Sequence, residues 1–307
     1  MKPLHRALAD YLAMRRALGF KLEREGTLLP GFVDYVVECG GSTVTTTAAV
    51  AWATQPHDSH PAWWTHRLSM VRGFAKYLQT LNPKTEVPAL DLLPHRRPRQ
   101  APYVYSTAEI EALQAAAQTL RHPLRATTYV TLIGLLAVTG IRVGEAIALD
   151  DDDLDHRRAV LVIRTGKFRK PREVPVHRST VRALARYMDE RDRRVRRRKT
   201  PSLLVSSVGK RLIYQNVHDT FLRLVYAAGL ADRRPRRPRI HDLRHTFAIQ
   251  AVLAWYRAGD DVEAKMPLLS TYLGHVGPSA TYWYLSAVPE LLQAATARLE
   301  RAMRVRP

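Results

Sequence analysis

Six polar side chains in the second half of the sequence are of types that can act on a phosphate group. Guanidiniums fork across the charged oxygens of a phosphate, imidazoles accept and donate protons, and a tyrosine hydroxyl can attack to form a covalent intermediate. In chain order the candidates are Arg142, Lys167, His241, Arg244, His275 and Tyr284. What they can do together depends on whether the fold brings them to one place.

Two pairs of polar residues have the spacing of neighbours on one face of a helix. His241 and Arg244 are three residues apart, and the apolar residues of that segment fall on another face, so we expect the pair to lie outside the core. Arg142 follows a very apolar stretch, where an unpartnered charge is costly. Glu145, three residues later, is placed to hold its guanidinium. Alone, either pair is also typical of a solvated helix surface.

The last two candidates follow the end of a helix. Gly274 is placed to close that helix, and His275 comes directly after it. Tyr284 ends a run of three aromatic residues, which alone is equally consistent with a core cluster.

The combination is more specific than its parts. The sequence contains, in order, TGIRVGEAIAL, TGKFRK, HDLRHTFA, LGH and a terminal tyrosine. This arrangement resembles the tyrosine recombinase family, which includes phage integrases, Xer-type recombinases and integrases of mobile elements. The resemblance is strong from about residue 106 to the end. Before that, only helical character and position match the family's core-binding domain. The long segment before LGH, residues 255–266, is similar to transposon-associated relatives.

The resemblance implies which tyrosine and which lysine react. The family's nucleophile lies nine residues after the LGH histidine, which selects Tyr284 over Tyr282. The family's general acid is a lysine on a hairpin, usually within Gly-Lys-Gly. Here Phe168 replaces the second glycine, and we favour Lys167 over Lys170.

The other candidates have the chemistry of supporting roles in the same reaction. Arg142 and Arg244 would stabilise the negative charge on the five-coordinate phosphorus. His241 would exchange a proton near the tyrosine, and His275 would hydrogen-bond the phosphate. Glu145 would orient Arg142.

The resemblance therefore implies a site-specific recombinase or integrase that cleaves and rejoins DNA through a 3′-phosphotyrosine, without metal, ATP or another cofactor. A type IB topoisomerase uses similar chemistry, but the core-binding-like first part and the LGH element favour a recombinase. A regulator that binds DNA without catalysis is a further alternative, against which the full set of candidates argues.

The elements that must position these residues are mainly helical. A capping box at Ser106 and Glu109 begins a second domain, 106–307. Apolar periodicity predicts helices over about 127–139, 178–192, 214–228, 240–257, 263–273 and 288–303, the last docking either on its own domain or on a neighbouring protomer. Strands at 160–164 and 173–176, joined by a tip at 165–167, predict a small antiparallel sheet.

The first part of the chain, residues 1–82, reads as four short helices, and the resemblance implies that they form a DNA-binding domain. Five prolines and several arginines make residues 83–105 a basic linker. Side chains off the apolar stripe of the fourth helix, in the linker and near the hairpin tip are candidates for DNA contacts: Arg67, Arg72, Lys76, Arg96, Arg97, Arg99, Arg169 and Lys170.

The overall charge agrees with a polyanionic partner. The chain has 48 Lys and Arg against 28 Asp and Glu, a formal net charge of +20, which favours double-stranded DNA. Its single cysteine, Cys39, excludes an internal disulfide and fits a reducing cytoplasm, with the bacterial nucleoid as the place of action. We expect no metal site and no membrane association. The resemblance adds self-association of four protomers on DNA, assisted by accessory recombinases or DNA-bending proteins.

Overall fold

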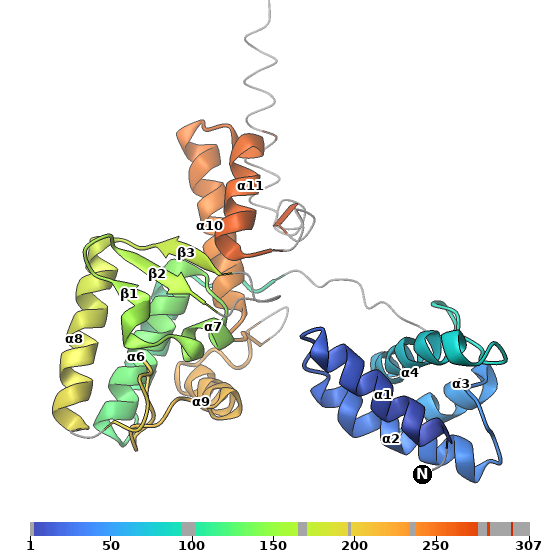
Figure 1. The fold of residues 1–307 in the computed structure, drawn as a ribbon. Coiled ribbons are helices and arrows are strands. Elements are labelled where there is room, and N and C mark those ends of the chain that lie inside the picture. Colours follow the sequence, from blue (N-terminus) through green and yellow to red (C-terminus); the bar gives the residue numbers. More distant parts are fainter. Residues whose placement is uncertain are drawn as a thin grey trace, which may run out of the picture. The chain divides into compact units, whose positions relative to one another are not determined.

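The computed structural model describes residues 3–93, 102–164, 171–195, 198–233, 237–275, 281–282 and 296. The chain divides into two compact units, Met1–Gln100 and Ala101–Pro307, and Figure 1 shows their helices and strands. The expected class, mainly α with a small antiparallel sheet, is confirmed. No helix in the described residues is long and apolar enough to cross a membrane.

The first unit is a four-helix assembly around one apolar core. Its helices are α1 (Pro3–Ala17), α2 (Glu23–Glu38), α3 (Thr46–Thr54) and α4 (Pro61–Leu81). Each contributes an apolar stripe at helical spacing, and among the fully buried side chains are Phe32 of α2 and Phe74 of α4.

The expected linker 83–105 is shortened from both ends. Thr85 is buried and bonds to Thr43, and the carbonyls of Pro88 and Ala89 accept hydrogen bonds from Arg72 of α4. Residues 83–93 thus pack on the first unit. At the other end, Tyr105 is buried in the second unit and its backbone N–H donates to Thr246. Pro88 does not prevent this packing, because its carbonyl still accepts a hydrogen bond.

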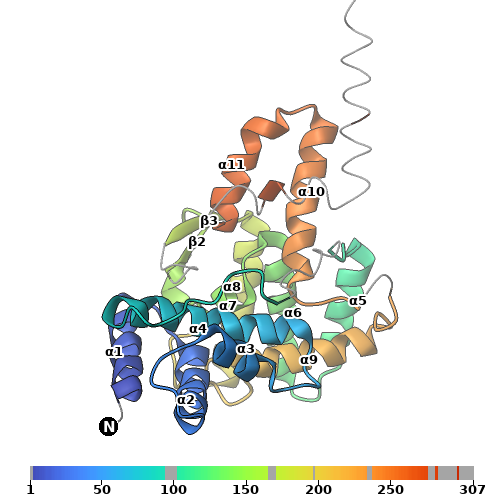
Figure 2. The same ribbon diagram turned by 90° about the vertical axis from the view of Figure 1, so that its right-hand side faces the viewer.

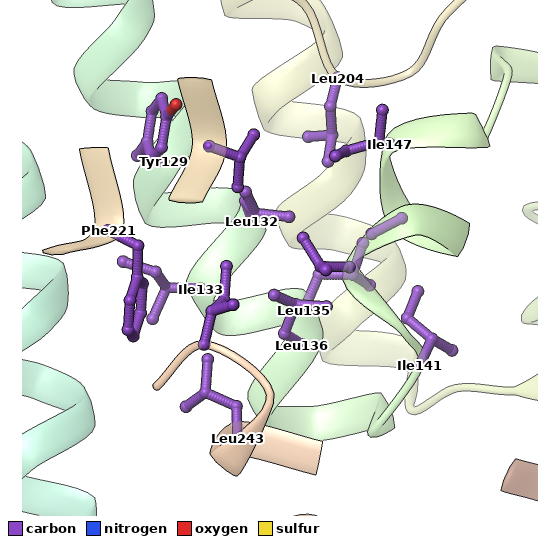
Figure 3. Close-up of a cluster of buried hydrophobic side chains, with 14 of the residues drawn as sticks. Tyr129, Leu132, Ile133, Leu135, Leu136, Ile141, Ile147, Leu204, Phe221 and Leu243 are labelled. Carbon is purple, nitrogen blue, oxygen red and sulfur yellow. The ribbon is translucent and has the colours of Figure 1, made fainter. Parts of the chain in front are cut away.

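The second unit is built around α6 (Pro123–Thr139). Helix α5 (Thr107–Gln118) begins with the expected capping box, and α7 (Val143–Ala148) follows α6 after a turn at Gly140. Figure 3 shows Leu132, Ile133 and Leu136 of α6 among side chains of α7, α9 and α10. This core fixes the places where α7 and α10 begin, and both beginnings carry candidate residues.

A three-stranded antiparallel sheet lies in the same unit, in the order β1-β2-β3. It comprises β1 (Leu154–Asp155), after a short 3-10 turn η1 (Asp151–Asp153), then β2 (Val160–Ile163) and β3 (Arg172–Pro175). The register pairs Ile163 with Arg172 at the end where β2 and β3 approach residues 165–170. The two longer strands are those that the sequence predicts, whereas β1 is too short to show a period of two.

Four longer helices complete the unit: α8 (Arg178–Arg194), α9 (Tyr214–Ala227), α10 (Asp242–Ala258) and α11 (Val262–Leu273). All four agree with the predicted helices to within a few residues. Helices α10 and α11 lie side by side and extend away from the rest of this unit in both views (Figures 1 and 2). They share their own apolar cluster, centred on Ile249, Val252 and Met266. The predicted helix 288–303 lies outside the described residues except at position 296.

Candidate active site

The first turn of α10 supplies two of the candidates. His241 is the residue just before the helix, and Arg244 lies within its first turn. Arg244 is buried, with 3% of its surface exposed, which corrects the expectation that it lies outside the core, whereas His241 is exposed as expected. Its Nη1 donates to the carbonyl of Gly140 at 2.8 Å, and its Nη2 donates to the carbonyl of Leu273 at 2.6 Å. Buried charge of this kind needs such partners.

Arg142 lies at the start of α7, where the turn at Gly140 ends. Its Nη1 donates to Glu145 Oε1 at 2.8 Å, and its backbone N–H donates to Glu145 Oε2 at 2.9 Å. Its Nη2 donates to the carbonyl of Gly274 at 3.0 Å. The contact that the sequence predicts between Arg142 and Glu145 is therefore present, and about a quarter of the arginine side chain stays exposed.

A second arginine, absent from the sequence prediction, also bonds to Glu145. Arg172, the first residue of β3, donates from Nη1 to Oε1 at 3.0 Å and from Nη2 to Oε2 at 2.8 Å. Burial raises the pKa of Glu145, but the hydrogen bonds and charges of Arg172 and Arg142 outweigh that effect and hold the pKa below its usual range. Glu145 is thus ionised at neutral pH.

The end of α11 is where these side chains meet. The carbonyls of Tyr272, Leu273 and Gly274 accept hydrogen bonds from Arg172, Arg244 and Arg142 respectively. The last carbonyls of a helix lack partners within the helix, and cations at this end also interact favourably with the helix dipole. The chain folds so that three guanidiniums, from β3, α10 and the start of α7, supply those partners.

His275 leaves this helix end directly into the same cluster. Its Nδ1 lies 2.6 Å from Oγ1 of Thr281, a fully buried residue. Sequence reasoning did not single out Thr281. This hydroxyl engages Nδ1 and so fixes the orientation of the imidazole ring.

Both histidines have pKa values far below normal. Burial lowers the pKa of His241 to about 4, and the positive charge of Arg244 adds to the effect. Burial likewise lowers the pKa of His275 to about 4, followed by the charges of Arg244 and Arg142. Although His241 is exposed at the surface, the charges of Arg244, Arg239 and Arg142 act in the same direction as desolvation, and the carboxylate of Asp242 opposes them in part. Both rings are neutral at neutral pH.

The cluster has the character of a site for an anion. Its guanidiniums present forked donors, its two neutral imidazoles can each accept or donate a proton, and the carboxylate of Glu145 is shared by Arg142 and Arg172. A phosphate diester suits this set in charge and in hydrogen-bonding geometry. In the part of the chain that the structure describes, no group of three His, Cys, Asp or Glu side chains could hold a metal ion.

The structure brings together four of the six catalytic candidates, Arg142, His241, Arg244 and His275, with Glu145. The other two, Lys167 and Tyr284, lie outside the described residues, as do the DNA-contact candidates Arg96, Arg97, Arg99, Arg169 and Lys170. Arg172 begins the strand that follows residues 165–170, and Thr281 lies three positions before Tyr284.

Two of the predicted DNA contacts in the first unit are corrected. Arg67 is buried, stacks 3.8 Å over the ring of Trp52 and donates to that residue's carbonyl. Arg72 is buried and donates to the carbonyls of Pro88 and Ala89. Both charges are used inside the unit and cannot reach a phosphate as they stand. Lys76, one turn after Arg72, is exposed and stays a candidate.

Comparison with known proteins finds relatives along most of the chain. The model of the phage integrase family matches residues 104–290. A Sinorhizobium fredii protein provisionally named integrase/recombinase y4rB is 41% identical over 98% of both chains. A tyrosine recombinase XerC from Herpetosiphon aurantiacus is 29% identical over 89% of this chain and 87% of its own.

Solved structures agree on the fold. The Tn1549 transposon integrase in complex with circular intermediate DNA superposes with a TM-score of 0.67 and 18% identity, covering 96% of this chain and 99% of that one. The XerH site-specific recombinase bound to its difH substrate superposes with a TM-score of 0.65 and 19% identity, covering 88% and 77%.

Proposed function

Because this chain belongs to the phage integrase family of tyrosine recombinases, we propose that the cluster at the end of α11 is the place where it breaks and rejoins DNA strands. The chain is a site-specific DNA recombinase. This location is supported by the contacts at the end of α11. Arg244 and Arg142 donate to the consecutive carbonyls of Leu273 and Gly274, and His275 is the next residue.

The two catalytic arginines would hold the scissile phosphate between them. Each donates to main-chain carbonyls that fix its orientation in advance. Donors that are already oriented stabilise charge as it develops on phosphorus, and losing one typically costs about 3–4 kcal/mol of barrier. Glu145 would keep the guanidinium of Arg142 from turning away.

Tyr284 would attack the phosphorus and form a 3′-phosphotyrosine, which releases a 5′-hydroxyl. The phenol must lose its proton during attack, and nearby guanidiniums favour the phenolate. His241, neutral at neutral pH, would accept that proton, and Lys167 would donate one to the leaving oxygen. Because the phosphotyrosine retains the energy of the broken bond, a second strand can be joined without ATP.

His275 would donate a hydrogen bond from Nε2 to a phosphate oxygen. This needs the tautomer protonated on Nε2, in which Nδ1 accepts the hydrogen bond of the Thr281 hydroxyl. Thr281 would therefore fix the imidazole in its donating form.

Several features of the whole protein belong to the same proposal. The first unit and the basic stretch before residue 102 would grip duplex DNA with the second unit, and four protomers would assemble on two duplexes, with accessory recombinases or DNA-bending proteins assisting. The reaction would take place on DNA in the bacterial cytoplasm. Neither the topoisomerase alternative nor the inactive regulator is favoured by the family relatives.

The test is a search for the covalent intermediate. A duplex site selected from a random DNA pool is nicked close to the cleavage point, so that the released fragment diffuses away and the adduct accumulates. We expect wild-type protein to form a denaturant-resistant protein–DNA adduct, and Tyr284→Phe to bind the same DNA without forming one, because it lacks the nucleophile.

Tyr282→Phe is the matched control. It removes a hydroxyl two positions away and should leave the adduct in place. Adduct formation by Tyr284→Phe, or its loss only in Tyr282→Phe, would reject the assignment.

A further inference from the structure

Arg172 connects three parts of the site without resembling a phosphate ligand. It begins β3, its forked nitrogens bond to both oxygens of Glu145, and its Nε donates to the carbonyl of Tyr272 at 2.8 Å. Its side chain is 11% exposed, and that of Glu145 is 4% exposed. Each of its three nitrogens therefore already has a partner within the protein.

Arg142 uses its nitrogens differently. It bonds to one oxygen of Glu145 with Nη1 and to one carbonyl with Nη2, and its side chain is about twice as exposed as that of Arg172. Each terminal nitrogen of a guanidinium carries two hydrogens, so both arginines have one left on each, but only the more exposed side chain of Arg142 can present them to an anion. Of the two arginines that bond to Glu145, Arg142 is therefore placed to contact a ligand and Arg172 is not.

We infer that Arg172 is a positioning residue for strand cleavage: it fixes Glu145, and through it Arg142, and it fixes the turn that presents His275. This inference rests on the proposed function of the site. Without Arg172, Glu145 would be held by Arg142 alone. The carboxylate would then draw that guanidinium toward itself, and away from the phosphate.

The turn at Gly274 gives independent support. Gly274 has φ +66°, and a Cβ at this position would lie 2.9 Å from Nη1 and 3.0 Å from Cζ of Arg172. The backbone that leads into His275 is therefore packed directly against this guanidinium. Both the left-handed conformation and the close approach require glycine.

Stability alone is a weak reason for the arrangement. A buried ion pair pays a large desolvation cost, and apolar side chains of similar size often replace one without loss of stability. Two guanidiniums on one buried carboxylate leave an uncompensated positive charge, which is useful where an anion will bind.

The same strand offers a matched control pair. Glu173, the next residue, accepts a similar fork from Arg158, at 2.9 Å and 2.7 Å. That pair is exposed, with 60% and 51% of the two side chains accessible. It repeats the geometry of the Arg172–Glu145 pair on the surface, where such pairs contribute little.

The experiment compares two substrates for each variant. One carries the normal scissile phosphate. In the other, a methylphosphonate replaces one charged oxygen by a methyl group, so the demand for a well-placed guanidinium falls. The rate of covalent adduct formation is measured for wild type, Arg172→Met, Arg172→Lys and Arg158→Met. Because the ratio of the two rates is taken within one preparation, it does not depend on the fraction of folded protein.

We expect Arg172→Met to slow cleavage of the phosphate by about 100-fold, the scale expected when a misplacement of about 1 Å disturbs a reacting group. The loss on the methylphosphonate should be at least ten-fold smaller. Arg172→Lys, which retains the charge but not the fork, should lie between wild type and Arg172→Met, and supplies the ratio if Arg172→Met does not fold. Arg158→Met should give the wild-type ratio.

An Arg172→Met or Arg172→Lys protein with the wild-type ratio would overturn the inference, and so would an equal change in Arg158→Met. A wild-type protein that forms no adduct through Tyr284 would instead reject the proposed function, so the two failures are distinguishable.

Discussion

At the scale of single residues, the three guanidiniums at the end of α11 bond to neighbouring carbonyls but differ in exposure. Arg244 is buried, Arg172 is nearly so, and Arg142 keeps about a quarter of its side chain accessible. The imidazoles beside them are neutral because burial and positive charge both disfavour the imidazolium. A bound phosphate would reverse part of this effect.

The first prediction concerns these two imidazoles. In the free protein His241 and His275 should titrate with pKa values of about 4, and binding of duplex DNA should raise both, because the phosphate offsets the charges of Arg244 and Arg142. Nuclear magnetic resonance titration of the imidazole resonances measures this, with His275→Gln to assign one of them. Values near 6.5 in the free protein would contradict it.

The same shifts make stability depend on pH. In the unfolded chain both histidines bind a proton near pH 6.5, whereas in the folded protein they bind it only near pH 4. The stabilisation is therefore complete above about pH 6.5 and is lost as the pH falls toward 4. Urea unfolding at pH 7, 5.5 and 4 should show a smaller loss in His275→Gln than in wild type.

Residue patterns predicted the site only where both partners are close in sequence. The pairing of Arg142 with Glu145 follows from a spacing of three. Arg172 was missed because its partners lie 27 and 100 positions away, and no local period reveals them. The VP that follows Glu173 marks β3 as a strand, but no feature of the sequence marks Arg172 as different from the other arginines nearby. Arg67 and Arg72 were misassigned for a related reason: the loop carbonyl that Arg72 satisfies lies 16 positions away.

At the scale of elements, the helices were predictable because their apolar faces repeat at helical spacing, and α8 to α11 agree closely with the sequence. The ends of the linker were not, since packing of Thr85 and Tyr105 depends on contacts with distant helices. The sequence predicted which glycines end helices, but it did not predict which side chains pack against each of them.

A second prediction separates two such glycines. Gly140 and Gly259 both end helices with positive φ, +61° and +76°, but a Cβ on Gly140 would lie 2.5 Å from Phe247, whereas none lies within 4 Å of one on Gly259. Gly259→Ala should lower the free energy of unfolding by about 1 kcal/mol, because only the left-handed conformation disfavours alanine there. Gly140→Ala should cost about 1–3 kcal/mol more because of overpacking.

Urea unfolding of the second unit measures both losses. If both variants lost the same free energy of unfolding, the ring of Phe247 would move aside for the added methyl group at little cost. Since the carbonyl of Gly140 also accepts from Arg244, Gly140→Ala should in addition slow adduct formation, whereas Gly259→Ala should not.

At the scale of the whole molecule, the net charge of +20 should dominate DNA affinity. Each phosphate contact releases counterions, so the affinity should fall by about 10³-fold or more between 50 and 200 mM salt if about six contacts or more form. Lys76→Gln should lower the slope of log affinity against log salt by about 1.

Arg72→Gln is the control for that prediction. It removes the same charge one turn away on α4, but from a side chain already engaged by Pro88 and Ala89. It should reduce the stability of the first unit and leave the salt slope unchanged. A slope reduced as much as in Lys76→Gln would contradict the structural assignment of Arg72. Fluorescence anisotropy across a salt series measures both.

The close approach of Arg172 to Gly274 has a consequence for engineered chimaeras. The two residues are 102 positions apart, yet one occupies the space that the other leaves empty. Grafting the β2–β3 hairpin of a distant relative onto this scaffold would change only one side of that fit. If the relative that supplies the hairpin lacks an arginine at the start of its third strand, the chimaera has an empty space beside Gly274, and Glu145 keeps only Arg142 as a partner. The hairpin and the turn at Gly274 and His275 are therefore best exchanged together.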